Sequence, residues 1–200
     1  MTLDVFAALF LFAFVTSITP GPNNLMLMAS GVNFGFRRTI PHMLGIGAGF
    51  LSLLLGVGFG LGAVLAAWPP LHMALKVAGG AYLLYLAWRI AMARSMGNAD
   101  GAGEASRPMS FLEAAAFQWV NPKAWVMAVT AMAVYTSPQA PFLSVLLVAS
   151  AFALVNVPCV STWAGFGVAL RGFLAEPARL KWFNIVMGLL LVASVWPMLA

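Results

Sequence analysis

Long apolar stretches, separated by short charged or Pro- and Gly-rich segments, dominate the pattern of this chain. A helix needs about 20 apolar residues to cross the hydrocarbon core of a bilayer, and the stretches are of that order or longer. They lie at about residues 5–34, 43–67, 73–93, 111–135, 142–168 and 181–199. The pattern therefore predicts an all-α integral membrane protein with six transmembrane helices.

Composition agrees with this prediction and excludes a soluble protein. Of the 200 residues, 62% are hydrophobic and 8% are charged, which is too little charge for a water-facing surface. Six crossings use nearly the whole length, so we expect a single transmembrane domain over residues 1–200 with the lipid bilayer as its environment. The single cysteine, Cys159, excludes an internal disulfide and a multi-thiolate metal site, and we expect no cofactor or metal.

The basic residues predict the orientation, because short loops rich in Lys and Arg stay in the cytoplasm. They gather in alternate loops, on the side that would hold Arg37, Arg38, Arg89, Arg94, Arg107, Arg171, Arg179 and Lys181. The opposite side holds Lys76. We therefore expect both termini to be periplasmic and the central loop, about 94–110, to be cytoplasmic. The net charge of +5 has this topological explanation, so no nucleic-acid partner is expected.

The two halves of the chain resemble each other weakly. Pro22 and Pro122 lie 100 positions apart, and Leu-Lys pairs at Leu75-Lys76 and Leu180-Lys181 are expected to open the third and sixth spans. Three spans in each half would place the halves in opposite orientations. The sequence thus predicts two inverted three-helix repeats, about 1–93 and 111–200, an architecture common in secondary transporters.

Spans one and four are predicted to be broken at prolines. The first contains Thr19-Pro20-Gly21-Pro22-Asn23 and the fourth contains Asn121-Pro122-Lys123. A proline removes a backbone hydrogen bond, so each break frees carbonyls and starts a new helix with unpaired N–H groups inside the membrane. Those N–H groups suit a carboxylate and the freed carbonyls suit an ammonium group, as in a zwitterionic amino acid. The alternative is a pair of plain proline kinks satisfied by neighbouring helices.

Several polar residues near these breaks are candidates for substrate contact. The proposed substrate-binding residues are Thr19, Pro20, Gly21, Pro22, Asn23, Asn24, Asn121, Pro122, Lys123 and Asn156. Intramembrane Lys123 would attract a carboxylate, snorkel to an interface, or bond a freed carbonyl such as that of Gln118 or Ile18. Asn156 and Pro158 are expected to break the fifth span. Asn156 would there either line a substrate path or pack against neighbouring helices.

Other features have simpler interpretations. The run Gly45-Ile46-Gly47-Ala48-Gly49 favours close helix packing. His42 and His72 are expected at membrane interfaces. No Ser–His pair or HExxH motif lies within the spans, so no catalytic residues are expected and an enzyme is disfavoured.

Two groups of residues give the chain a family resemblance. Ser17-Ile18-Thr19-Pro20-Gly21-Pro22-Asn23-Asn24, followed by Gly35-Phe36-Arg37-Arg38, resembles the N-terminal signature of the LysE/RhtB amino-acid exporter family. The likeness continues through Gly79–Arg89 and Phe117–Lys123. Within the family, the doubled Asn23-Asn24 is most similar to the branch that exports cysteine and O-acetylserine, but Pro122 departs from that branch. The substrate is therefore left open.

The resemblance implies secondary-active efflux of amino acids or close derivatives across the bacterial inner membrane, with the proton as coupling ion. Alternating access would take place around the broken helices. A homo-oligomer is compatible with the sequence. The competing hypothesis is a membrane binding or scaffold protein that transports nothing.

Overall fold

A computed structural model describes residues 2–96 and 107–196 of the chain, and over these residues the protein is helical. In chain order the helices are α1 (Leu3–Ile18), α2 (Pro22–Phe34), α3 (Phe36–Gly56), the π-helical turn η1 (Val57–Leu61), α4 (Gly62–Ala67), α5 (Pro69–Ala91), α6 (Phe111–Val120), α7 (Pro122–Tyr135), α8 (Pro141–Leu170), the 3-10 turn η3 (Phe173–Ala175) and α9 (Pro177–Ala193).

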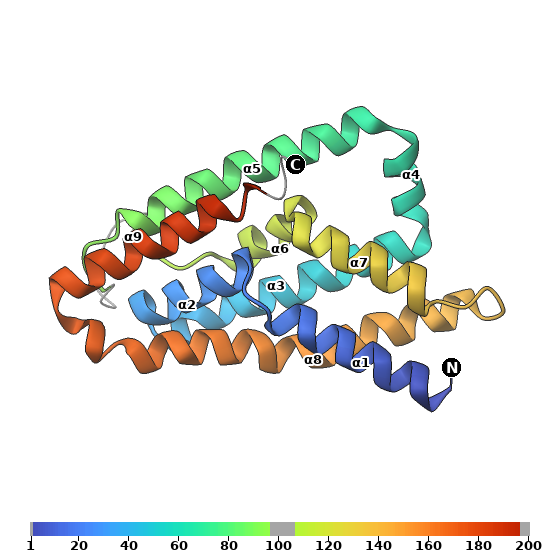
Figure 1. Ribbon diagram of the computed structural model, residues 1–200, viewed down its shortest axis with the longest axis horizontal. Coiled ribbons are helices and arrows are strands. Elements are labelled where there is room, and N and C mark those ends of the chain that lie inside the picture. The colour runs from blue at the N-terminus through green and yellow to red at the C-terminus, as the bar shows by residue number, and fades with distance from the viewer. Residues whose placement is uncertain (1, 97–106, 197–200) are drawn as a thin grey trace.

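The helices form an elongated bundle (Figure 1). Helices α5 and α9 lie side by side along one edge, α8 runs along the opposite edge, and α2, α3, α6 and α7 fill the space between them. Two apolar clusters hold the bundle together. One joins α2, α3, α5, α6, α8 and α9, and the other joins α1, α3, α7 and α8.

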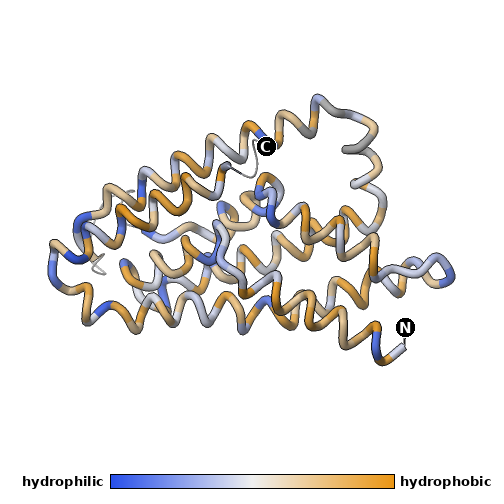
Figure 2. Tube along the Cα trace, viewed as in Figure 1, coloured by the Kyte–Doolittle hydropathy of each residue, from blue (hydrophilic) through white to orange (hydrophobic). Residues whose placement is uncertain are grey.

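Apolar side chains also cover the outside of the bundle, and Figure 2 shows hydrophobic residues along most of each helix. Large exposed apolar residues occur on many helices, among them Leu11, Val126, Leu154 and Leu189. An apolar surface of this extent is stable only against lipid. By length and composition, α3 with η1 and α8 can each cross a membrane, and α1 with α2 makes a third span if this pair, bent by 55°, is counted as one. The six-span arrangement stays a prediction.

The two predicted breaks are confirmed. α1 ends at Ile18 and α2 begins at Pro22, while α6 ends at Val120 and α7 begins at Pro122. In each case the proline occupies the first turn of the new helix, where its missing N–H costs no intrahelical bond.

Other predicted boundaries are wrong. α5 and α9 begin at Pro69 and Pro177, before the Leu-Lys pairs, because a proline suits the first helical position. The second span begins earlier than predicted, since Gly35 alone, with φ +81°, makes the turn between α2 and α3. The same span does not continue straight to residue 67, because Gly60, with φ +111°, ends its helical path before α4.

The predicted break of the fifth span is also wrong, because α8 is continuous through Pro158. One proline removes a single backbone bond, and the packing of α8 along α1, α2 and α3 is enough to keep the helix whole. Most of the predicted central loop and the last residues of the sixth span lie outside the described residues.

The glycine run of α3 does pack closely, as predicted. A Cβ atom added to Gly45 would lie 2.3 Å from the Phe111 carbonyl oxygen, and one added to Gly49 would lie 2.4 Å from that of Ala115. Helix α3 therefore rests directly on the backbone of α6, which fixes the first half of the fourth span next to the second span.

Candidate functional site

The first break is held by side chains that bind the carbonyl groups at the end of α1. Asn24 Nδ2 donates to the Ser17 and Thr19 carbonyls, at 2.8 Å in both cases. Trp163 Nε1, from α8, donates to the Ile18 carbonyl at 2.9 Å. The Trp163 bond replaces the backbone donor that Pro22 cannot supply to Ile18, and the Asn24 bonds satisfy carbonyls that are left without a helical partner where α1 ends.

Lys123 reaches the first break from the second one. Its ammonium nitrogen Nζ lies 2.7 Å from the Thr19 carbonyl oxygen and 3.5 Å from that of Pro20. Of the three roles expected for Lys123, the structure shows the bond to freed carbonyls, although at Thr19 and Pro20 rather than Gln118 or Ile18. The ammonium group that these carbonyls hold is thus one of the protein's own.

Gly21 makes room for this lysine. Its backbone is extended, with φ −174°, so the conformation itself needs no glycine. A Cβ atom at this position would, however, lie 2.8 Å from Lys123 Cδ and 3.1 Å from its Nζ. The glycine therefore lets the lysine side chain pass directly over the backbone of the first break.

The second break is capped by its own residues. Asn121 is 2% exposed, and its Oδ1 accepts a hydrogen bond from the Lys123 backbone N–H at 3.1 Å. Trp125 Nε1 donates to the Trp119 carbonyl at 2.7 Å. The side-chain cap satisfies the start of α7, whereas α2 has no side-chain cap.

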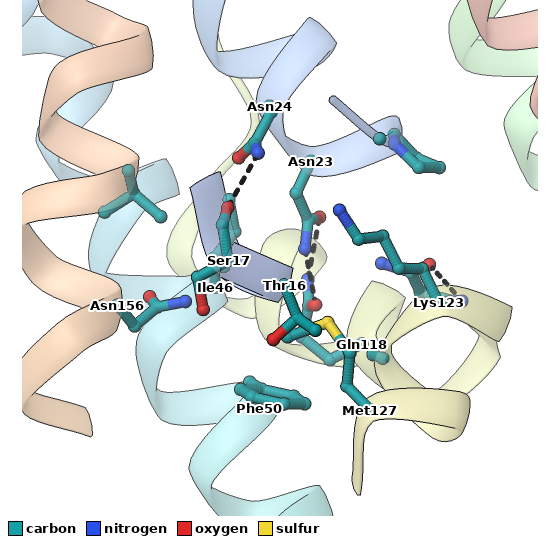
Figure 3. A pocket seen from close by; sticks show the side chains of 15 residues that line it. Thr16, Ser17, Asn23, Asn24, Ile46, Phe50, Gln118, Lys123, Met127 and Asn156 are labelled. Carbon is teal, nitrogen blue, oxygen red and sulfur yellow. Dashed lines mark hydrogen bonds between the residues drawn. The ribbon is translucent and has the colours of Figure 1, made fainter. Parts of the chain in front are cut away.

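The two breaks meet through a reciprocal amide pair. Asn23 Nδ2 donates to Gln118 Oε1 at 2.7 Å, and Gln118 Nε2 donates back to Asn23 Oδ1 at 3.1 Å. Gln118 is fully buried and also donates to the Ala114 carbonyl at 2.9 Å. Figure 3 shows this pair in the middle of the site, between Thr16 and Lys123.

A pocket of about 400 Å³ opens between the breaks. Of the residues predicted from the sequence, those in its lining are Gly21, Pro22, Asn23, Asn24, Asn121, Lys123 and Asn156. Thr19, Pro20 and Pro122 lie at the breaks but outside the lining, and the Thr19 hydroxyl donates to the Val15 carbonyl. The structure thus brings the two breaks and Asn156 together at one pocket, while substrate binding by these residues stays a prediction.

Sequence reasoning missed part of this lining. The missed residues are Thr16, Ser17, Ile46, Phe50, Gln118, Ala124, Met127 and Val160. Ser17 and Gln118 carry a usable signal, because each is a polar side chain within a predicted apolar span. The apolar members carry none, since an apolar residue in a membrane helix is the default.

Two polar atoms of the pocket have no hydrogen-bond partner within the described residues. They are Ser17 Oγ and Asn156 Oδ1, and both residues are 8% exposed. Buried polar atoms are normally paired, so an unpaired one that faces a pocket indicates a polar ligand or water. Among the described lining residues Lys123 is the only charged one. The described residues contain no group of three or more His, Cys, Asp or Glu side chains able to hold a metal ion.

Comparison with known proteins identifies the family. Residues 14–194 match the LysE type translocator family. The chain is 33% identical to the cysteine/O-acetylserine efflux protein of Escherichia coli (strain K12), over 96% of each chain. It is equally similar to the protein of the same description from Shigella sonnei. No solved structure matches the chain at a significant level. The chain therefore belongs to the LysE type translocator family and is a multi-pass membrane transporter, not an enzyme.

Proposed function

We propose that this protein exports amino acids or close derivatives from the cytoplasm across the bacterial inner membrane. The carrying observation is that two broken spans, far apart in the sequence, meet in one pocket through Asn23–Gln118 and Lys123–Thr19. The relatives described as cysteine/O-acetylserine efflux proteins support the direction of transport and the class of substrate. Cysteine and O-acetylserine are accordingly the first substrates to test.

The pocket suggests how a zwitterion would be held. A carboxylate would accept hydrogen bonds from the first turn of α2, which lacks a side-chain cap, close to the positive charge of Lys123. An ammonium group would donate to Asn156 Oδ1 and Ser17 Oγ, which have no hydrogen-bond partner in the described part of the chain. A small side chain would lie against Phe50 and Met127, at the lower side of the site in Figure 3.

Transport would proceed by alternating access between two inverted three-helix repeats. In this arrangement α1 with α2 and α6 with α7 are the broken spans one and four, and both termini are periplasmic. The bonds that join the two breaks would be remade as the repeats rock, so that the pocket opens to one side at a time.

Coupling to the proton-motive force is part of the proposal. No Asp or Glu is among the described residues that line the pocket. The proton would therefore be carried on the substrate or move through water. Alternatively, it would be exchanged for a cation that the carbonyl groups at the break hold.

Export measurements test this function directly. Cells that overproduce the protein are loaded with labelled O-acetylserine or cysteine, and efflux is followed with and without a protonophore. We expect faster efflux than from empty-vector cells, loss of the gain with protonophore, and loss of the gain in Asn23→Ala and Lys123→Ala. Unchanged efflux in well-expressed variants would reject the site. No gain across a full amino-acid panel would reject the function and favour a scaffold.

Topology needs a separate measurement. A reporter that is active only in the cytoplasm is fused to the C-terminus, and another to the central loop. We expect a silent C-terminal fusion and an active loop fusion. An active C-terminal fusion would contradict the six-span arrangement with both termini outside.

A further inference from the structure

A second pocket, of about 520 Å³, lies between α2, α3, α5 and the segment that precedes α6. On α3 it is lined by His42, one helical turn before Ile46, which lines the first pocket. On α2 its lining begins at Met26, just after Asn24 of the first pocket. The two pockets therefore follow one another along the same two helices, and the second is nearer the start of α3.

His42 is a polar side chain that the bundle encloses. It is 1% exposed, and neither ring nitrogen has a hydrogen-bond partner within the described residues. The structure thus corrects the prediction of an interfacial histidine. A neutral imidazole carries one donor and one acceptor, and leaving both unpaired inside a protein is costly. An unpaired ring in the wall of a pocket therefore indicates a function for its two nitrogens.

The neutral polar side chains in the same wall do not serve this ring. Ser30 Oγ is 2.9 Å from Thr39 Oγ1. Asn33 Nδ2 donates to Asn184 Oδ1 at 2.9 Å and Asn33 Oδ1 receives a bond from Asn184 Nδ2 at 3.2 Å. Ser30 and Asn33 line the pocket with hydrogen bonds already made, so the His42 ring differs from both of them.

The charged side chains around the ring also have partners. Glu113, in the first turn of α6, is close enough to His42 to interact with it electrostatically, and it binds Arg107 through two oxygens, each at 2.7 Å. Arg89, on α5, lines the pocket with its guanidinium carbon 5.8 Å from the centroid of the Tyr85 ring. Both arginines of the lining are thus already engaged within the protein.

The other titratable groups of the surrounding helices are accounted for in the same way. Tyr82, on α5, interacts electrostatically with the same charged side chains. Arg38, one turn before His42, has its guanidinium carbon 5.5 Å from the centroid of the Phe34 ring. Lys123, on α7, lines the first pocket and not the second. Within the described lining of the second pocket, the imidazole is therefore the group that changes its charge near neutral pH.

His42 lies on the face of α3 that rests on α6. It precedes Gly45 and Gly49 by three and seven positions, a spacing that places all three on one side of a helix. A Cβ atom added to either glycine would meet the backbone of α6. Helix α8 contacts α3 from another side, where a Cβ added to Gly47 would lie 3.8 Å from the neutral amide of Asn156. Movement of α3 against α6 would therefore change the surroundings of the His42 ring.

Protonation of this ring would in turn act on the helices that form the first pocket. The ring nitrogen without a hydrogen accepts the proton, and the ring becomes an imidazolium with two N–H donors and a positive charge. Such a charge inside a membrane bundle has to be met by water or by new partners. Because α2 and α3 carry both pockets, a rearrangement around the ring reaches the first pocket directly.

We propose that His42 is the proton-binding residue through which the exporter couples amino-acid efflux to proton entry. The proposal rests on the proposed function and supplies a protein group for the route of the proton through water. In the state that opens outward, the ring takes up a proton from water that enters through the first pocket. In the state that opens to the cytoplasm, it releases the same proton through the second pocket, so the ring is unchanged after each cycle. Substrate binds in preference to the neutral form.

Transport by the purified full chain in liposomes tests the proposal. Exchange of labelled for unlabelled O-acetylserine needs no net proton movement, whereas transport driven by a pH gradient does. His42→Gln keeps a donor and an acceptor but cannot take up the proton. It should keep exchange and lose gradient-driven transport by about tenfold or more, a factor typical of coupling between two ligands. His72→Gln, the same change at the other histidine, is the matched control and should keep both.

A pH-sensitive dye inside the liposomes reports proton movement when substrate is added. The wild type should move protons, and His42→Gln should not. Gradient-driven transport with proton movement in His42→Gln would overturn the proposal and leave the export function intact. Equal loss of exchange and of gradient-driven transport would also overturn it, because His42 would then serve packing alone.

The wild type separates this proposal from the proposed function. Exchange of substrate without proton movement would overturn the coupling role of His42 while export stands. Absence of exchange for every amino acid in a full panel would reject the proposed function, and the coupling role with it.

Titration of the ring is a second test, and it needs no substitution at His42. The chain contains two histidines, so in His72→Gln, labelled with ¹⁵N-histidine and purified without a histidine tag, the ring signals are those of His42. Coupling between two ligands is reciprocal, so saturating O-acetylserine should move the ring toward its neutral form between about pH 4 and 8. The affinity for O-acetylserine should fall as the pH is lowered over the same range. A ring that does not titrate there, or that titrates identically with and without substrate, would overturn the proposal.

Discussion

The Lys123 ammonium group, on the second broken span, donates a hydrogen bond of 2.7 Å to the Thr19 carbonyl on the first. This bond joins two halves of the chain that are 104 residues apart in sequence. An ammonium group in a membrane needs such a partner, because an uncompensated charge there costs several kcal/mol, about 2.5–3.5 on insertion scales. The Lys123 ammonium group is also close to where we place the substrate carboxylate. It is therefore suited to exchange the Thr19 carbonyl for that carboxylate during transport.

Lys123→Met therefore should lower export by about tenfold or more, which corresponds to roughly 1.4 kcal/mol of lost interaction. Methionine keeps the length and the apolar stem but removes the charge. Lys123→Arg should retain part of the activity. Efflux from loaded cells measures both. The control is Lys181→Met, whose side chain is exposed beside the Trp182 ring and should leave efflux unchanged. Full efflux by Lys123→Met would show that the lysine is structural.

The amide pair Asn23–Gln118 should show energetic coupling in a double-mutant cycle. Asn23→Ala leaves a fully buried Gln118 with unpaired atoms, and Gln118→Ala removes both bonds to Asn23. Each single variant should lose stability, and the double variant should lose less than the sum, by about 0.5–3 kcal/mol. Unfolding of purified protein in a fixed detergent gives the free energies. Strict additivity would mean that the pair does not form.

Sequence reasoning could locate the breaks but not their partners. Pro20, Pro22 and Pro122 remove backbone donors whatever the tertiary structure, so the ends of α1 and α6 follow from local chemistry. Which groups replace those donors is decided by helices distant in sequence. Trp163 on α8 bonds the Ile18 carbonyl, and nothing in the local pattern around either residue indicates this contact.

The errors at helix boundaries have a related cause. Hydropathy shows where a segment is apolar, whereas a helix begins or ends where the backbone permits it. Gly35 and Gly60 turn the chain with positive φ inside or next to apolar sequence, and Pro177 starts α9 within a charged loop. The burial of the His42 ring likewise depends on what α2 and α5 place around it, and the local sequence around His42 does not show this.

Gly21→Ala should impair export through Lys123 rather than through the backbone. The added Cβ would lie 2.8 Å from Lys123 Cδ, which forces the lysine away from the Thr19 carbonyl. We expect a loss similar to that in Lys123→Met, and little further loss when Gly21→Ala is added to Lys123→Ala. The control is Gly165→Ala in α8, where a Cβ would meet no atom within 4 Å. Additive losses in the double variant would contradict this mechanism.

Asn156→Leu should separate stability from substrate binding. Asn156 Oδ1 is buried and has no hydrogen-bond partner among the residues that the structure describes, so replacing the amide by an apolar side chain of similar size should leave the melting temperature unchanged or raise it. If the oxygen accepts a bond from the substrate ammonium group, the same change should weaken binding by about tenfold or more. Asn184→Leu is the matched contrast, because Asn184 is fully buried but bonded to Asn33 and the Ala93 carbonyl. That variant should lose about 1–3 kcal/mol of stability. Thermal unfolding and O-acetylserine binding are measured on the same samples. A destabilised Asn156→Leu variant with wild-type affinity would assign Asn156 to packing and remove it from the substrate site.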